Sequence, residues 1–412
     1  MELKTKYQYT YFIYPYIIKE DKMKKYLLKL LRDKKINLRF FEKEKDFDIY
    51  NYFLPNIRDY LFKTFEFNSQ KKRKFKEFSD KMQANILSQY PCNIFEYEMK
   101  DDIQGKIIDE DGIFFKIQKI EIICFQTGIC FISMKTNIEN TNLFSDLLNF
   151  NYKFKDINSE LNTLKNYENI KIQTNKFQNM EELTKLIKRI TGNNTDTKKF
   201  DIDTNKFLIY NYCCIEQEFW NNELDFNKIE NEFIKYANIL PSRYSSTIDR
   251  RGIVILSKSS YVKIGINSSE TSLLSSSSDP NTYTKLPVFY ENQYLYHYIL
   301  ALYKKIYLKK ILKELTDKKE EKKARNKIIK FTKELWVREI TDNSFGSILE
   351  RTWKKELRIN SMYDNMKKQY DMLYKQTNIE KMQKLNRGII AALCVSLIVN
   401  IVNFITLMLL KM

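Results

Sequence analysis

The C-terminal part of the chain constrains its fold most strongly, because residues 388–410 include no charged side chain. This run of 23 residues, GIIAALCVSLIVNIVNFITLMLL, lies between Arg387 and Lys411. A helix rises about 1.5 Å per residue, so a run of this length crosses a hydrocarbon core of about 30 Å. A buried core helix is the alternative, but core helices rarely stay uncharged for so long. The sequence therefore predicts one C-terminal transmembrane helix over 388–410.

The charges that flank this segment predict its orientation. Cationic residues beside a membrane span are retained on the cytoplasmic side. One cation follows the segment, Lys411, and six precede it: Lys367, Lys368, Lys375, Lys381, Lys384 and Arg387. The N-terminus, MELKTKYQYTYF, lacks the continuous apolar stretch of a signal peptide. We therefore expect a single-pass protein of the plasma or inner membrane, with its N-terminal body in the cytoplasm and its short tail outside.

Composition argues against an enzyme. No GxxxxGK[ST], GxGxxG, GxSxG or HExxH motif occurs, and the single histidine, His297, predicts neither a catalytic centre nor a metal site. We expect His297 to be packed inside a tyrosine-rich helix, and we expect no cofactor. The six cysteines form no CxxC pair, which fits a reducing cytosol.

The net charge of +18 is compatible with nucleic acid, an anionic ligand or anionic lipid headgroups as partners. The densest basic run is KKRKFK at 71–76. It is interpreted as one solvated face of a helix, so no direct DNA binding is expected.

The first part of the chain predicts an α/β or α+β cytosolic domain, because strand-like and helix-like segments alternate. The clearest hairpin signal is 114–134, where two apolar runs flank Gln126-Thr127-Gly128. Strands are also predicted at 7–18, 205–215, 252–258 and 261–266, and helices at 20–34, 142–150, 180–191 and 225–239.

After a serine-rich segment at 267–280, interpreted as a loop, the pattern becomes helical. Helices are predicted at 288–315, at 317–341 and from 344 into the membrane. The predicted units are a cytosolic sensor domain (1–285), a helical region (286–345), a stalk helix (346–387) and the transmembrane helix (388–410).

An unbroken helix over 346–410 would be about 100 Å long. We expect such a rod to need copies of itself to bury its apolar stripe, which predicts a homo-oligomer of parallel helices. The stripe comprises Leu349, Trp353, Leu357, Met362, Met366, Leu373, Ile379 and Met382.

A polar stripe crosses the apolar segment. Ser396, Asn400 and Asn403 fall at i, i+4 and i+7, on one face of a helix, with Thr406 at its margin. Asparagine in hydrocarbon is unfavourable unless it faces protein or water. Two interpretations stay open: polar contacts that hold helices together, or amide rings around an ion path. In the second, the same face supplies hydrophobic constrictions, namely Ile389, Leu393 and Leu407.

The architecture resembles that of CorA-like divalent-cation transporters. The segment EIICFQTGICFISMKTNIENTNLFSDLLNFN at 121–151 is similar to the hairpin and helix of their cytosolic domains. The segment ITDNSFGSILERTWKKELRINSMYDNMKKQYDMLYKQTN at 340–378 is similar to their approach to the stalk. Two features depart from that family. The sequence predicts one span where CorA transporters have two, and it has no Gly-Met-Asn signature, since Gly192-Asn193-Asn194 is an ordinary turn far from the membrane.

The resemblance is greater to divergent CorA-like membrane effectors associated with type III CRISPR defence. It implies a tetrameric or pentameric ion channel opened by a small anionic nucleotide messenger, such as S-adenosylmethionine-AMP. Within 241–261, PSRYSSTIDRRGIVILSKSSY, cations are candidates for phosphate pairing and tyrosines for base stacking: Arg243, Arg250, Arg251, Tyr244 and Tyr261. Two other functions stay open, a CorA-type magnesium transporter and a tail-anchored membrane scaffold without transport. Solvated arginines beside a strand are the alternative for this segment.

Overall fold

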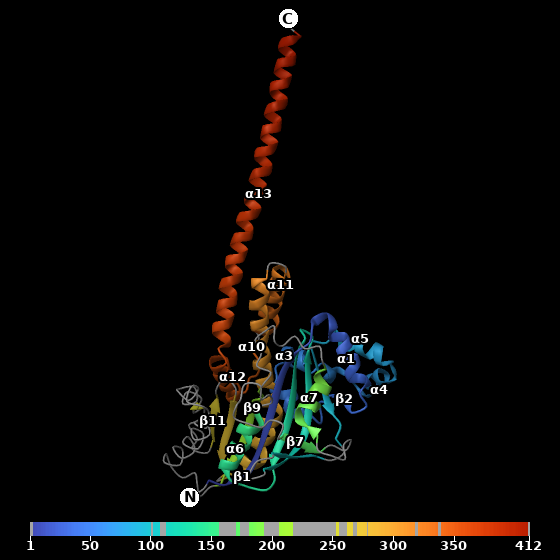
Figure 1. The fold of residues 1–412 in the computed structure, drawn as a ribbon, viewed down its shortest axis with the longest axis vertical. Helices are drawn as coiled ribbons and strands as arrows, with labels where there is room; N and C mark the ends of the chain where they lie inside the picture. Colours follow the sequence, from blue (N-terminus) through green and yellow to red (C-terminus); the bar gives the residue numbers. More distant parts are fainter. Residues whose placement is uncertain are drawn as a thin grey trace.

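A mixed α/β body from which one long helix projects is the architecture in the computed structural model (Figure 1). The described residues are 3–99, 102–107, 113–155, 170–173, 181–192, 206–216, 253–254, 262–266, 270–277, 279–317, 320–336 and 339–410. The N-terminal end of the described chain lies at the base of the body, and the C-terminal end lies at the far tip of the long helix.

One sheet organises the body. Within the described residues it has 12 strands, in the order β10-β11-β12-β9-β1-β6-β5-β4-β7-β8, with β3 also on β5 and β2 on β3. All of these pairs are antiparallel except β12 with β9. The strands are β1 (Thr5–Ile17), β2 (Ile36–Leu38), β3 (Cys92–Tyr97), β4 (Ile103–Ile107), β5 (Phe114–Phe125), β6 (Ile129–Ile138), β7 (Ile170–Gln173), β8 (Glu181–Glu182), β9 (Leu208–Ile215), β10 (Ile253–Val254), β11 (Val262–Ile266) and β12 (Glu270–Ser276).

The predicted hairpin at 114–134 is confirmed as β5 and β6. In the register of the two strands, Cys124 of β5 lies opposite Cys130 of β6 beside the turn. Gly128 has φ +84°, a conformation that only glycine adopts without strain, and a Cβ there would lie 2.0 Å from the Ile18 carbonyl oxygen. Two constraints therefore require glycine in this turn: the positive φ angle, and the close approach of the Ile18 carbonyl oxygen.

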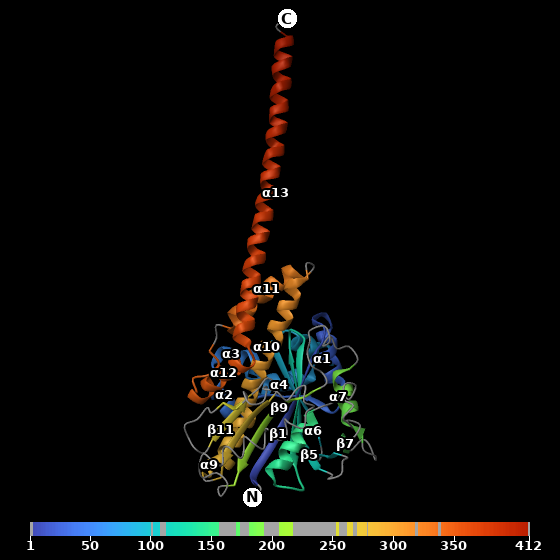
Figure 2. The ribbon, with the colours of Figure 1, turned by 60° about the vertical axis from the view of Figure 1, so that its left-hand side comes forward.

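Helices cover both faces of the sheet (Figure 2). On one face, α1 (Met23–Arg32), α6 (Phe144–Lys155) and α7 (Leu183–Thr191) share a hydrophobic core with strand residues such as Phe12 and Ile122. On the other face, α10 (Leu295–Thr316) packs on alternate residues of the same strands, such as Tyr11 and Ile123. The period of two residues along each strand separates the two cores.

Shorter helices complete the body. They are η1 (Glu20–Lys22), α2 (Phe47–Tyr52), α3 (Pro55–Leu61), η2 (Lys63–Glu66), α4 (Ser69–Glu77) and α5 (Asp80–Leu87). Helix α4 carries the basic run 71–76 and buries Phe75 alone, so that run lies on a solvated helix face as predicted.

The tyrosine-rich helix begins earlier than the predicted residue 288. Helix α9 (Asn281–Phe289) continues through a π-helical turn, η7 (Tyr290–Tyr294), into α10. Pro287 lies inside α9, and its missing N–H removes one helical hydrogen bond just before the wider turn. The next segment is α11 (Glu321–Phe331) followed by a second π turn, η8 (Thr332–Trp336).

The interpretation of 267–280 as a loop is wrong for most of its length, because β12 occupies Glu270–Ser276. The strand pairs with β11 and β9 and is almost entirely buried. Hydroxyl groups reach partners that composition does not reveal: Ser275 Oγ lies 2.9 Å from the Tyr212 hydroxyl, for instance. Paired hydroxyls make a serine-rich strand tolerable inside a protein.

The prediction of one unbroken helix over 346–410 is also wrong. The structure has two helices, α12 (Ser344–Glu356) and α13 (Ile359–Leu409). Arg358 separates them with φ +57°, the only positive φ at a described residue other than glycine. Helix α13 has 51 residues and is therefore about 77 Å long.

The predicted helix at 225–239 and the residues 252 and 255–258 of the predicted strand 252–258 lie outside the described residues. The other predicted strands and helices of the first 266 residues are present, each within a few residues of its predicted bounds.

Candidate functional site

The apolar segment 388–410 forms the upper part of α13 and touches no other described part of the protein. Every one of its residues is exposed, and Figure 1 shows this part of α13 standing far from the body. By length and composition, α13 is the one helix among the described residues that could cross a membrane. This agrees with the predicted span.

The polar stripe lies along this exposed part of the helix. Because α13 is regular here, Ser396, Asn400 and Asn403 fall on one face, as the spacing predicts. The Thr406 Oγ1 atom lies 2.9 Å from the carbonyl oxygens of Val402 and Asn403, so its hydroxyl is satisfied by its own helix. Thr406 therefore contributes less hydrogen-bonding capacity to the stripe than the two amides do.

The predicted constrictions share this setting. Ile389, Leu393 and Leu407 are exposed side chains of the same helix, below and above the polar residues. The structure thus brings all seven predicted pore residues onto one exposed helix. Whether they meet copies of themselves remains a prediction.

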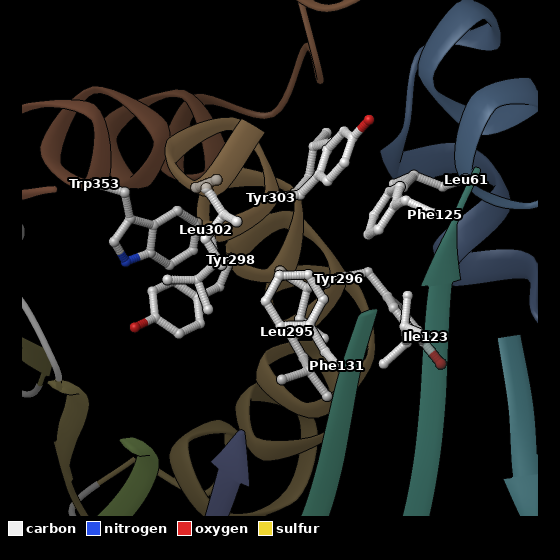
Figure 3. Packing of buried hydrophobic residues seen from close by; sticks show 14 of the residues in the cluster. Leu61, Ile123, Phe125, Phe131, Leu295, Tyr296, Tyr298, Leu302, Tyr303 and Trp353 are labelled. Carbon is white, nitrogen blue, oxygen red and sulfur yellow. The ribbon is translucent and has the colours of Figure 1, made fainter. Parts of the chain in front are cut away.

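Helix α12 joins α13 to the body. Leu349 and Trp353 are fully buried, and the Trp353 ring lies between α12 and α10, next to Tyr298 (Figure 3). The Trp353 Nε1 atom donates to Thr271 Oγ1 of β12 at 3.3 Å. The first turns of α13 continue this contact through the buried side chains of Ile359 and Met366.

The two ends of the predicted apolar stripe differ in burial. Leu349, Trp353, Leu357 and Met366 pack on their own body, whereas Ile379 and Met382 are 58% and 59% exposed. The expectation that the whole rod needs copies of itself is therefore wrong for the lower half of the stripe. The body supplies its own cover there, through α10 and α11.

A charged cluster that sequence reasoning missed is buried beside α12. Lys304 of α10 is 1% exposed, and its Nζ atom lies 3.6 Å from Glu350 Oε1, which also forms an ion pair with Lys354 Nζ at 2.7 Å. Burial lowers the pKa of Lys304 to about 8. The cluster ties α10 to α12 electrostatically, and only the fold brings these residues together.

The single histidine lies in the same region and is packed, as predicted. His297 is fully buried, with Nδ1 2.7 Å from the Tyr52 hydroxyl and its ring edge-on to Trp353. Burial, together with the positive charges of Lys304 and Lys354, lowers the pKa of His297 to about 3. The imidazole is therefore neutral at physiological pH.

A second buried charge joins the sheet to α10. Glu121 accepts from Arg39 at 2.6 Å and from the Tyr296 hydroxyl at 2.7 Å. Burial alone would raise the pKa of Glu121, but the charges of Lys119 and Arg39 and the bond from Tyr296 lower it to about 2. These contacts hold the sheet and α10 as one packed unit.

The predicted ligand residues lie outside the described residues: Arg243, Tyr244, Arg250, Arg251 and Tyr261. Of the segment 241–261, the structure describes Ile253 and Val254, which form β10 on the edge of the sheet. Among the described residues, no group of three or more His, Cys, Asp or Glu side chains could hold a metal ion.

Comparison with family models, with curated proteins and with solved structures finds no match to this chain.

Proposed function

We propose that copies of this chain assemble through their apolar segments into an ion-conducting pore in the plasma or inner membrane. In this proposal the cytoplasmic body binds a small anionic nucleotide, such as S-adenosylmethionine-AMP, and the pore then opens. The resemblance to CorA-like effectors supports the proposal that such a device acts in antiviral type III CRISPR defence. One observation carries the proposal: the apolar segment 388–410 is fully uncovered and bears a straight polar stripe.

The energetics of that stripe favour assembly. An amide left without a partner in hydrocarbon costs several kcal/mol, by analogy with other buried polar groups. One helix alone in lipid would expose Asn400 and Asn403 to that cost on every copy. A symmetric bundle removes it, because each amide then faces other amides or water. Rings of Ile389, Leu393 and Leu407 would supply apolar constrictions that gate by dewetting.

A route from the proposed ligand segment to the pore helix runs through the edge of the sheet. Residues 241–261 include β10 and directly precede β11 in the sequence. Helix α12 packs against β11, and Trp353 contacts β12, the neighbour of β11. In the proposal, a ligand bound by Arg243, Arg250 or Arg251 acts on α12 through the chain connection to β10 and β11.

The test is ionic current through the purified protein in planar bilayers, with and without S-adenosylmethionine-AMP. We expect current only with the nucleotide. Replacing Asn400 and Asn403 together by leucine should abolish current while the oligomer persists, because the face becomes apolar and dewets. The matched control replaces both by glutamine, which keeps the amides and should retain current.

The rival functions predict other outcomes. A CorA-type magnesium transporter would conduct without nucleotide and would rescue cells starved of magnesium, and a scaffold would pass no current under any condition. Loss of the oligomer in the double leucine variant would mean that the asparagines hold the helices together. Unchanged current in an intact oligomer would mean that this face does not line the pore.

A further inference from the structure

The joint between α12 and α13 lies against one side of α10 (Figure 1). The ring of Tyr298 in α10 contacts the ring of Trp353 in α12, with centroids 5.3 Å apart. Seven and eleven residues after Tyr298, Lys305 and Lys309 lie on the same face of α10. Two lysines therefore lie on the face of α10 that meets the joint, where Arg358 separates the two helices.

Cations outnumber acids at this joint. Glu350 of α12 is the one carboxylate among the described residues that pairs with Lys304 or Lys354, at 3.6 Å and 2.7 Å. The side chains of Lys305 and Arg358 have no ion pair or hydrogen bond with any described residue. Four cations of the joint therefore share one carboxylate.

Burial makes this excess of positive charge unfavourable. Lys304 is buried, and its Nζ atom donates no hydrogen bond to the described residues. Lys305 is half-buried, and burial together with the charges of Lys309 and Arg358 lowers its pKa to about 8. Like charges repel one another more strongly where water is partly excluded, and an anion bound among them removes that repulsion.

We propose that the joint of α12 and α13 binds a phosphate group, either free or carried by a nucleotide. Lys305, Lys309 and Arg358 supply cations that are half-buried or exposed, and Lys304 adds a buried positive charge. A phosphate group carries up to two negative charges and several acceptor oxygens, so it pairs with several cations at once. A chloride ion or a carboxylate supplies a single charge and leaves most of the excess in place.

The distance from the apolar segment excludes a phospholipid headgroup as the source of this phosphate. Thirty residues of α13, about 45 Å of helix, separate Arg358 from Gly388 at the start of that segment. The headgroup region extends only about 5–8 Å beyond the hydrocarbon core on each side. The ligand of the proposal is therefore a soluble phosphate compound.

A ligand at this site would act directly on the helix that carries the apolar segment. Arg358 has φ +57° and precedes Ile359, the first residue of α13. An anion held by Lys305 and Lys309 of α10 and by Arg358 ties the start of α13 to the body. The proposal depends neither on ion conduction nor on the segment 241–261, because none of its residues belongs to that segment.

Equilibrium dialysis of the full chain in detergent against radiolabelled phosphate tests the site. We expect Lys305→Gln and Arg358→Gln each to weaken phosphate binding about tenfold or more, because each removes one charged donor. The matched control is Lys25→Gln, an exposed position of α1 on the opposite face of the sheet, which removes the same charge and should leave binding unchanged. Competition by AMP distinguishes the sources: stronger binding than phosphate assigns a nucleotide, and equal binding assigns the free phosphate group.

The melting temperature gives a second readout that a merely structural lysine would not produce. Without phosphate, Lys305→Gln should melt at a higher temperature than the unchanged protein, because the repulsion is smaller. Added phosphate should then raise the melting temperature of the unchanged protein and not that of the variant. Arg358 is exposed, so Arg358→Gln reports on binding even if Lys305→Gln does not fold.

Three results would overturn the proposal: no saturable phosphate binding, equal binding by Arg358→Gln and the Lys25→Gln control, or a folded Lys305→Gln variant that melts lower without phosphate. Because no current is measured, a protein that binds phosphate here but does not conduct keeps this site and loses the proposed channel. A channel that conducts but binds no phosphate at the joint keeps the proposed function and loses the site.

Discussion

Helix α10 and the upper part of α13 are both long and apolar, yet their surroundings are opposite. Helix α10 is buried on nearly all sides, between the sheet and the helices α11 to α13 (Figure 3). The apolar segment of α13 is exposed on all sides. The difference teaches that apolar content alone does not separate a core helix from one that requires lipid or further copies.

The two helices differ in how they carry polar groups. Helix α10 buries charged residues such as Lys304 and Lys310, and the body provides a partner for each: Glu350 for the first, and Glu20 with the Thr127 carbonyl oxygen for the second. The apolar segment carries no charge, and its amides at Asn400 and Asn403 are exposed. A core helix tolerates charge where the fold supplies a counter-charge, and a membrane helix must do without it.

Deleting the apolar segment should have the largest effect of the changes considered, because it should remove the protein from the membrane. A chain that ends at Arg387 should move from the carbonate-resistant membrane fraction to the soluble fraction. Its body should remain folded, because among the described residues neither hydrophobic core includes one beyond Leu373. A chain in which 388–410 is replaced by leucine and alanine is the control and should stay in the membrane. Carbonate extraction that releases the full-length chain would contradict the membrane assignment.

Replacing one leucine by alanine in the buried helix α12 and one in the exposed part of α13 should change the free energy of unfolding by different amounts. Leu349→Ala in α12 removes a fully buried side chain and should lower the free energy of unfolding of the body by about 2–5 kcal/mol. Leu409→Ala in α13 removes a side chain that is 67% exposed and should change it by less than about 0.5 kcal/mol. Urea unfolding in detergent, followed by circular dichroism, measures both. Similar losses in the two variants would mean that the upper helix packs on the body.

Acidification should lower the stability of the body because His297 is buried, and this effect should be smaller. The pKa of His297 is about 3 in the folded state, against 6.5 for an exposed histidine. Below pH 6.5 the unfolded chain therefore takes up a proton that the folded chain does not, and stability falls by about 1.4 kcal/mol per pH unit. Between pH 6.5 and pH 5 the loss should reach about 2 kcal/mol.

The variant His297→Gln should flatten that dependence. Because His297 is the only histidine in the chain, no other imidazole titrates in this range. Glutamine keeps an acceptor for the Tyr52 hydroxyl. Urea unfolding at several pH values measures the slope, and an unchanged slope in the variant would show that another group is responsible. The pKa of Glu121 is lowered to about 2, so protonation of Glu121 reduces the stability of the fold only once the pH falls below the ordinary value of 4.5.

Local signals were sufficient for much of the fold. The hairpin was predictable because Gly128 lies between two apolar runs, and the amphipathic spacing of α1 and α7 needs no tertiary information. The serine-rich strand β12 was not predictable, because its hydroxyl partners come from distant residues such as Tyr212. The break between α12 and α13 at Arg358 was not predictable either, since arginine carries no sequence signal for a left-handed conformation.

For the candidate site, the sequence by itself determined the apolar segment and the stripe of Ser396, Asn400 and Asn403. Both follow from composition and from the fixed 3.6-residue period of a helix, which do not depend on neighbours. Only the tertiary structure decided which half of the long apolar stripe is covered. Met366 and Ile379 look alike in sequence, but α10 and α11 extend far enough to bury only the first. Burial is a property of the surfaces that meet, and a single helix cannot specify the other one.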